Sequence, residues 1–141
     1  MLIIVAQATH TLSDLKRSVP AMLQAAQRAY DAWEQDDEGL DPELGAGGIC
    51  QDIAEEMAGV LLGQGIDAAT VSQQVGDQHV YVLARLVDGV YEVDIPPSVY
   101  ESGSGYVWRK IPGVRFDESM LSVYKISGNP ADFEEMTGEW M

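Results

Sequence analysis

The chain is 141 residues long and 46% hydrophobic, which is enough apolar side chain to build the core of one domain over residues 1–141. Its 23 acidic and 8 basic residues leave a formal net charge of -15, which disfavours direct binding to nucleic-acid phosphates and to anionic membranes. The single cysteine excludes an intramolecular disulfide, and no apolar run has the length of a membrane span or the flanks of a secretory signal, so we expect a cytoplasmic protein.

The first half of the chain predicts two helices. Ser18, followed by Val-Pro, is typical of a helix N-cap, and apolar residues at three- and four-residue spacing continue the helical pattern over residues 18–33. A second apolar stripe predicts a helix over residues 50–64, ended by Gly65. The inward face of this second helix is predicted to consist of Ile53, Ala54, Met57, Ala58, Leu61 and Leu62.

An acidic, glycine-rich loop joins the two predicted helices over residues 34–48. Segments of this composition are most often solvated loops. The alternative interpretation is a docking surface for a basic protein, such as one that itself binds nucleic acid. The carboxylates that would form this surface are Asp36, Asp37, Glu38, Asp41 and Glu43.

The second half of the chain predicts short strands and one last helix. An Asp-Gly pair between two β-rich runs is a strong hairpin signal. The predicted strands cover residues 68–72, 79–86, 90–95, 106–110 and 120–126, and Asn-Pro opens a short helix over residues 129–135. Helices first and strands afterwards predict an α+β domain, with N-terminal helices packed on a small antiparallel sheet.

The open ends of the predicted hairpin carry two residues that can act together chemically. His79 begins the first arm, and Asp94 lies near the end of the second. In an antiparallel pair the approximate neighbours are Val82 with Val93 and Val80 with Asp94, give or take a residue. His79 and Asp94 are therefore predicted to lie within reach of each other, as a histidine held in one tautomer by a carboxylate requires.

Cys50 opens the second predicted helix, directly after the pair Gly47-Gly48. A nucleophilic cysteine works as its thiolate, which a helix N-terminus and a nearby imidazolium both favour. The glycines allow a close approach of substrate to the backbone, whose amides can bind a developing oxyanion. Only the placement of Cys50 against the hairpin is left to the tertiary fold.

Four segments resemble, in order, the sequence motifs of the transglutaminase-like superfamily, a branch of the papain-like fold. Residues 48–54 (GICQDIA) resemble the nucleophile motif, and residues 65–71 (GIDAATV) resemble the family's entry to its sheet. Residues 79–82 (HVYV) resemble the histidine strand, and residues 90–96 (VYEVDIP) resemble the aspartate strand. The resemblance covers residues 47–97, about a third of the chain, and its strength lies in the order of the four motifs.

The resemblance implies a papain/transglutaminase-like core and a cysteine-dependent hydrolase or acyltransferase that acts on an amide or thioester. In such an enzyme Cys50 attacks the carbonyl carbon, His79 serves as base and then as acid, and Asp94 orients His79. A small domain of this kind implies a protein or peptide substrate docked on the surface. One cysteine and two histidines form a poor ligand set, so we expect no metal, and we expect no cofactor.

The family's tryptophan just upstream of the nucleophile has no counterpart in this chain. A donor to the developing oxyanion must therefore come from elsewhere. The candidates are the side chains of Gln51 and Gln78 and the backbone at Gly48.

Other interpretations of these residues stay open. A single cysteine, histidine or aspartate at such positions is usually structural. Tyr100, Tyr106 and Trp108 form either the lining of a cleft or a satellite hydrophobic cluster, and the cluster is slightly favoured. In size and charge the chain also resembles anti-CRISPR and other anti-defence proteins of phages and mobile elements. The alternative function is therefore a non-catalytic, acidic binding or inhibitor protein on the same scaffold.

Overall fold

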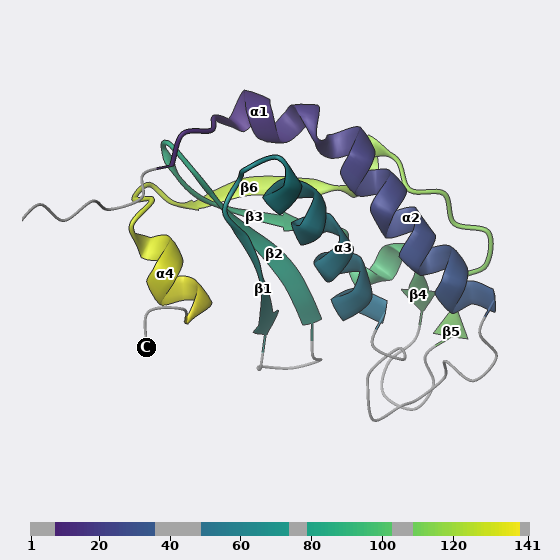
Figure 1. Cartoon of the computed structure of the whole chain (residues 1–141). Helices are drawn as coiled ribbons and strands as arrows, with labels where there is room; N and C mark the ends of the chain where they lie inside the picture. The colour runs from purple at the N-terminus through teal and green to yellow at the C-terminus, as the bar shows by residue number, and fades with distance from the viewer. Residues whose placement is uncertain (1–7, 36–48, 74–78, 103–108, 139–141) are drawn as a thin grey trace, which may run out of the picture.

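The computed structural model describes residues 8–35, 49–73, 79–102 and 109–138, and within them the chain is α+β, as predicted (Figure 1). Four helices accompany a four-stranded antiparallel sheet in these described residues. The helices are α1 (Leu12–Arg17), α2 (Val19–Gln35), α3 (Ile49–Gly63) and α4 (Asp132–Thr137). In this part of the chain no helix combines the length and the apolar character that crossing a membrane requires.

The sheet is built around the hairpin that the sequence predicts. Its strands lie in the order β1-β2-β3-β6 and are all antiparallel to their neighbours. Their bounds are β1 (Ala68–Gln73), β2 (His79–Leu86), β3 (Gly89–Asp94) and β6 (Ser122–Ser127). At the turn, Gly89 has a φ of 152° and lies so close to β6 that an added Cβ would meet the carbonyl oxygen of Ser127 at 2.0 Å. Only glycine fits there, so the hairpin begins its second arm at this residue.

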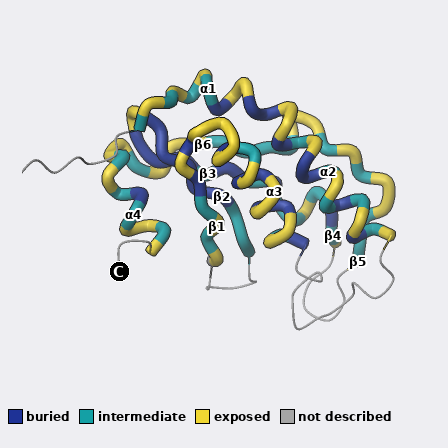
Figure 2. The backbone as a smooth tube through the Cα atoms, in the orientation of Figure 1, coloured by how far each residue is buried: buried dark blue, intermediate teal, exposed yellow. Residues whose placement is uncertain are grey.

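Helix α3 packs on β1 and β2, and α2 packs on α3, so the main core lies between the helices and one face of the sheet (Figure 2). Five of the six predicted inward residues of α3 are buried. The sixth prediction, Leu62, is wrong, since this side chain is 55% exposed. Successive helical residues differ by about 100° in direction, and Leu61 already takes the inward position.

The opposite face of the sheet is covered in part by α4. Leu83 and Val90 alternate along their strands with residues of the main core, and they form a second cluster with Phe133 of α4. Arg85, on the same face, is 8% exposed and forms ion pairs with Asp67 and Glu134. Its guanidinium carbon lies 5.5 Å from the centre of the Phe133 ring. These contacts attach the C-terminal helix to the sheet.

The N-terminal helices differ from the prediction at one point. The short helix α1 was not predicted, although Thr11 and Asp14 form a capping box at its start. Ser18 does precede α2, but its backbone is helical, and its N–H donates to the carbonyl of Leu15 and so closes α1. Two helices therefore meet at a residue for which the sequence predicted a single start.

The remaining predicted elements appear with shifted bounds. The predicted strand 106–110 is described only at β5 (Arg109–Lys110), which pairs with β4 (Glu101–Ser102) as a separate ribbon. Two short 3-10 turns, η3 (Pro97–Val99) and η5 (Glu118–Met120), precede β4 and β6. Proline at position 130 stands before α4, consistent with its preference for helix starts.

Candidate active site

The N-terminus of α3 presents Cys50 from a well-anchored helix. Ile49, the first residue of α3, is fully buried in the main core, and it fixes the start of the helix. Cys50 follows as a free, partly buried thiol that packs against the same core. Because α3 is 15 residues long, its aligned peptide dipoles place a partial positive charge at this end. Cys50 therefore lies at the electropositive end of the helix.

The hairpin brings His79 and Asp94 together by its register. Val82 pairs with Val93, as predicted, and continuing the register past this pair brings the open ends of β2 and β3 side by side. The Nε2 atom of His79 lies 2.9 Å from both Oδ1 and Oδ2 of Asp94. The two side chains are 17% and 15% exposed, so this contact is largely shielded from water.

Cys50 lies against the imidazole of His79. Figure 1 shows the first residues of α3 and of β2 at the same edge of the molecule. The pKa of His79 is raised to about 9, first by its hydrogen bond to Asp94 and next by its interaction with the Cys50 side chain, while burial lowers it. Since Asp94 occupies Nε2, the nitrogen available to the thiol is Nδ1.

The contact between the thiol and the imidazole lacks good hydrogen-bond geometry. His79 Nδ1 is buried, and no residue in the described part of the chain forms an aligned hydrogen bond with it. Catalytic hydrogen bonds are often long or poorly aligned before substrate binds, and they tighten in the Michaelis complex. The described residues thus bring together the cysteine, the histidine and the carboxylate that the sequence singles out.

The charges around His79 determine the protonation of its ring at neutral pH. A histidine whose pKa is about 9 carries a proton at pH 7, so the ring is an imidazolium between a carboxylate and a sulfur. Positive charge beside a sulfur favours the thiolate, and the carboxylate stabilises the positive charge. A thiolate–imidazolium pair of this kind can attack a carbonyl and then protonate a leaving group.

Tyr100 is a neighbour of the site that the sequence did not assign to it. The residue is 1% exposed and belongs to the main hydrophobic core, not to a satellite cluster as favoured from the sequence. Its pKa is raised first by burial and next by its interactions with Cys50, Glu101 and Asp94. Cys50 packs against the same core that contains Tyr100. The available signal was its position six residues after Asp94, beyond a Pro-Pro turn.

Gln51, one of the predicted oxyanion donors, lies on the exposed side of α3. Its amide nitrogen donates to a carboxylate oxygen of Glu55 one turn further along, at 2.8 Å. It is therefore held along the helix surface in this structure. The other predicted site residues fall outside the described residues, as do Tyr106 and Trp108: these are Gly48, Gln78, Asp36, Asp37, Glu38, Asp41 and Glu43.

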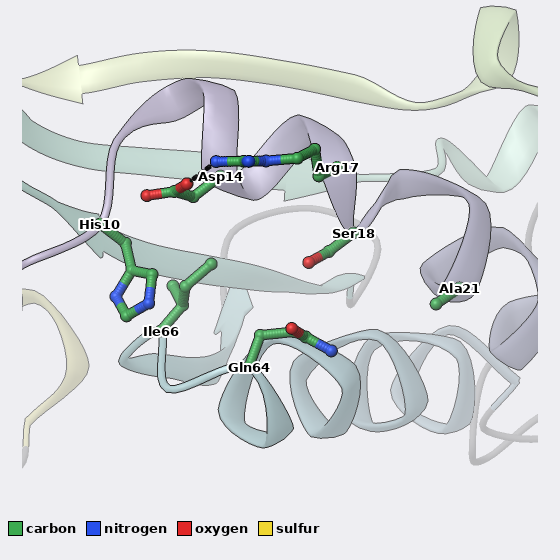
Figure 3. Close-up of a pocket in the computed structure, with 7 residues that line it drawn as sticks. All are labelled: His10, Asp14, Arg17, Ser18, Ala21, Gln64 and Ile66. Carbon is green, nitrogen blue, oxygen red and sulfur yellow. Dashed lines mark hydrogen bonds and ion pairs between the residues drawn. The ribbon is translucent and has the colours of Figure 1, made fainter.

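A surface hollow of about 390 Å³ opens at the opposite end of α3 (Figure 3). It is lined by His10, Asp14, Arg17, Ser18, Ala21, Gln64 and Ile66. The ion pair between Arg17 and Asp14 crosses its rim, within α1. A 15-residue helix is about 20 Å long, so this hollow is well separated from Cys50 and contributes nothing to its chemistry.

The described residues contain no group of three or more His, Cys, Asp or Glu side chains arranged to hold a metal ion.

Comparison of the chain with protein-family models, with curated proteins and with solved structures gives no match. The case for a function therefore depends on the site itself.

Proposed function

We propose that the chain is a cysteine-dependent hydrolase or acyltransferase that acts on an amide or thioester bond. The observation that carries the proposal is the convergence of Cys50, His79 and Asp94 at the N-terminus of α3. Structural cysteines and histidines can be buried singly, but a thiol, an imidazole and a carboxylate in this order of contact form the arrangement that activates a sulfur nucleophile.

In the proposed reaction each residue has a separate role. The thiolate of Cys50 adds to the carbonyl carbon and forms a thioester with the acyl group. The imidazolium of His79 gives its proton to the departing amine or thiol, and the neutral ring then takes a proton from the water or amine that cleaves the thioester. Asp94 holds Nε2 and so keeps Nδ1 directed towards the sulfur.

The proposed fold assignment is a papain/transglutaminase-like core. Its support is the order of elements: a helix that begins at the cysteine, followed by a strand that begins at the histidine and an adjacent strand that ends at the aspartate. The proposed substrate is a protein or peptide.

Alkylation of Cys50 provides the direct test. Because the chain has one cysteine, the mass shift after treatment with iodoacetamide reports on Cys50 alone. At pH 6.5 we expect labelling at least ten times faster than that of a free cysteine peptide, and a return to the peptide rate in His79→Ala. His10→Ala is the matched control, since the other histidine lies about 20 Å away beyond the far end of α3. Labelling of the wild type at the peptide rate would contradict the proposal.

A second candidate function is an acidic binding protein, of which an anti-CRISPR-like inhibitor is one form. The observation that favours it is the exposed face of α3, where Asp52, Glu55 and Glu56 form no ion pair with any basic residue in the described part of the chain. The pKa of Asp52 is raised by burial and then by these two neighbouring carboxylates. Cys50→Ala separates the candidates, because an acidic binder keeps its full biological effect after this substitution and a thiol enzyme loses it.

A further inference from the structure

The hydroxyl of Tyr100 is buried and has no hydrogen-bond partner among the described residues. Leaving such a group unpaired destabilises the folded state, so native proteins seldom keep one without a use for it. Tyr100 is 1% exposed, and water therefore does not satisfy the hydroxyl either. An unpaired donor beside a nucleophile is the property that an oxyanion site requires.

The ring of Tyr100 is held from several sides. Its backbone N–H donates to the carbonyl of Pro97 at 3.0 Å, and its carbonyl accepts from the N–H of Ile111 at 3.0 Å. The ring packs edge-on against Trp33 and Phe116, with centroid distances of 6.2 Å and 6.3 Å. A donor fixed in this way does not have to reorganise when charge develops on the substrate.

Tyr100 belongs to the same hydrophobic core against which Cys50 packs, and its hydroxyl stays protonated. Burial raises the pKa of the phenol first, and its interactions with Cys50, Glu101 and Asp94 raise it further. At neutral pH the group is therefore a neutral O–H donor in a water-excluded environment. Gln51, the donor that the sequence suggested on α3, is instead bonded to Glu55 on the helix surface.

We propose that the Tyr100 hydroxyl is the oxyanion donor of this site. The inference rests on the proposed thiol chemistry of Cys50. As the Cys50 sulfur forms its bond to the carbonyl carbon, the C=O π pair moves onto oxygen, and the Tyr100 O–H donates a hydrogen bond to that oxygen. When the pair returns, the C=O bond is restored and the leaving group departs with the electrons of its bond.

Two reagents separate this role from the generation of the thiolate. Iodoacetamide alkylates a thiolate by displacing iodide, without an oxyanion, whereas p-nitrophenyl acetate acylates it through a tetrahedral oxyanion and releases p-nitrophenolate. Tyr100→Phe keeps the ring and removes only the hydroxyl. We expect its alkylation rate to equal that of the wild type and its acylation rate to fall about 100-fold.

Tyr30→Phe is the matched control on a second buried tyrosine. The Tyr30 hydroxyl is fully used, because its single O–H is shared between Glu34 and the carbonyl of Ile111, and its oxygen accepts from the N–H of Val114. We expect this control to lower the melting temperature and to leave both rates unchanged well below the unfolding transition. Tyr100→Phe should show the reverse, with a melting temperature equal to or above that of the wild type.

The outcomes distinguish this inference from the proposed function. Fast alkylation of the wild type, with equal acylation of wild type and Tyr100→Phe, would overturn the oxyanion role and leave the thiol proposal intact. The oxyanion role would also be overturned if the wild type were alkylated fast but not acylated at all. A loss of both the alkylation and the acylation rate in Tyr100→Phe would overturn it as well. Alkylation of the wild type at the rate of a free peptide would instead remove the proposed function itself, and the oxyanion role with it.

Discussion

The two ends of strand β2 carry cationic side chains in different surroundings: Arg85 is buried and His79 is partly buried. At the turn end, Arg85 forms ion pairs with Asp67, which directly precedes β1, and with Glu134 of α4. At the open end, His79 is bound by Asp94 through one nitrogen, and its other nitrogen lies against a thiol without an aligned bond. Arg85 cannot lose its proton at any physiological pH, whereas His79 can.

This difference separates a structural ion cluster from the proposed reactive one. The Arg85 cluster joins three segments through two ion pairs, and its buried Nε has no hydrogen-bond partner among the described residues. The His79 group leaves one ring nitrogen free for proton transfer beside the sulfur. Burial and charge alone therefore do not identify a site, and an unused donor or acceptor beside a nucleophile is the more informative feature.

Removal of Arg85 should give the largest loss of stability. Arg85→Ala takes away the partner of two carboxylates and the cation over Phe133, and we expect the free energy of unfolding to fall by about 2–3 kcal/mol. Urea unfolding measures this loss. Arg17→Ala, at a 73% exposed ion pair within α1, is the control and should cost under about 0.5 kcal/mol. Under native conditions iodoacetamide should alkylate Cys50 in Arg85→Ala at the wild-type rate. If the alkylation rate fell as far as in His79→Ala, the distinction between the two ends of β2 would be wrong.

The pH dependence of stability should come from the open end of β2. In the unfolded chain His79 titrates near 6.5 and in the folded protein near 9, so the native state holds the extra proton between these values. The resulting stabilisation is fully present below pH 6.5 and is lost as the pH rises through 9. We expect the stability difference between wild type and His79→Ala to shrink by on the order of 2 kcal/mol between pH 6 and pH 9.5.

Urea unfolding at a series of pH values measures that difference. Arg85→Ala is the control, since the guanidinium keeps its charge throughout this range and its contribution should not change. A pH-independent difference between wild type and His79→Ala would mean that the proton is not held by Asp94 and Cys50.

Partial removal of the Arg85 cluster should have the smallest effect. Asp67 is 49% exposed, so its carboxylate stays hydrated when its charge is not paired. We expect Asp67→Asn to cost about 0.5 kcal/mol, because Glu134 still balances the arginine. Thermal unfolding followed by circular dichroism measures this change. A loss as large as that of Arg85→Ala would show that Asp67 alone accounts for the cluster.

The parts of this structure that the sequence predicted are local in the chain. The helix over residues 49–63 and the hairpin over residues 79–94 follow from periodicity and from an Asp-Gly turn. The hairpin in turn predicts the contact of His79 with Asp94, because its register depends on neighbouring residues and on a glycine that alone fits the turn.

Contacts between distant segments could not be predicted in the same way. The exposed position of Leu62, the double use of Ser18 by two helices and the attachment of α4 through Arg85 each depend on which surfaces pack together. Residue types and spacing do not predict how close two distant segments lie. Such segments come together only when the burial of apolar area in the whole core offsets the entropy cost of closing the loop between them.

The sequence by itself determined the imidazole–carboxylate pair and the position of a cysteine at a helix start. Only the tertiary structure decided that the cysteine interacts with the imidazole, and that the Tyr100 hydroxyl is buried in the same core without a hydrogen-bond partner among the described residues. The physical reason is range. Hairpin register is specified by backbone hydrogen bonds within 16 residues, whereas the approach of α3 to the end of β2 is specified by the packing of the whole core.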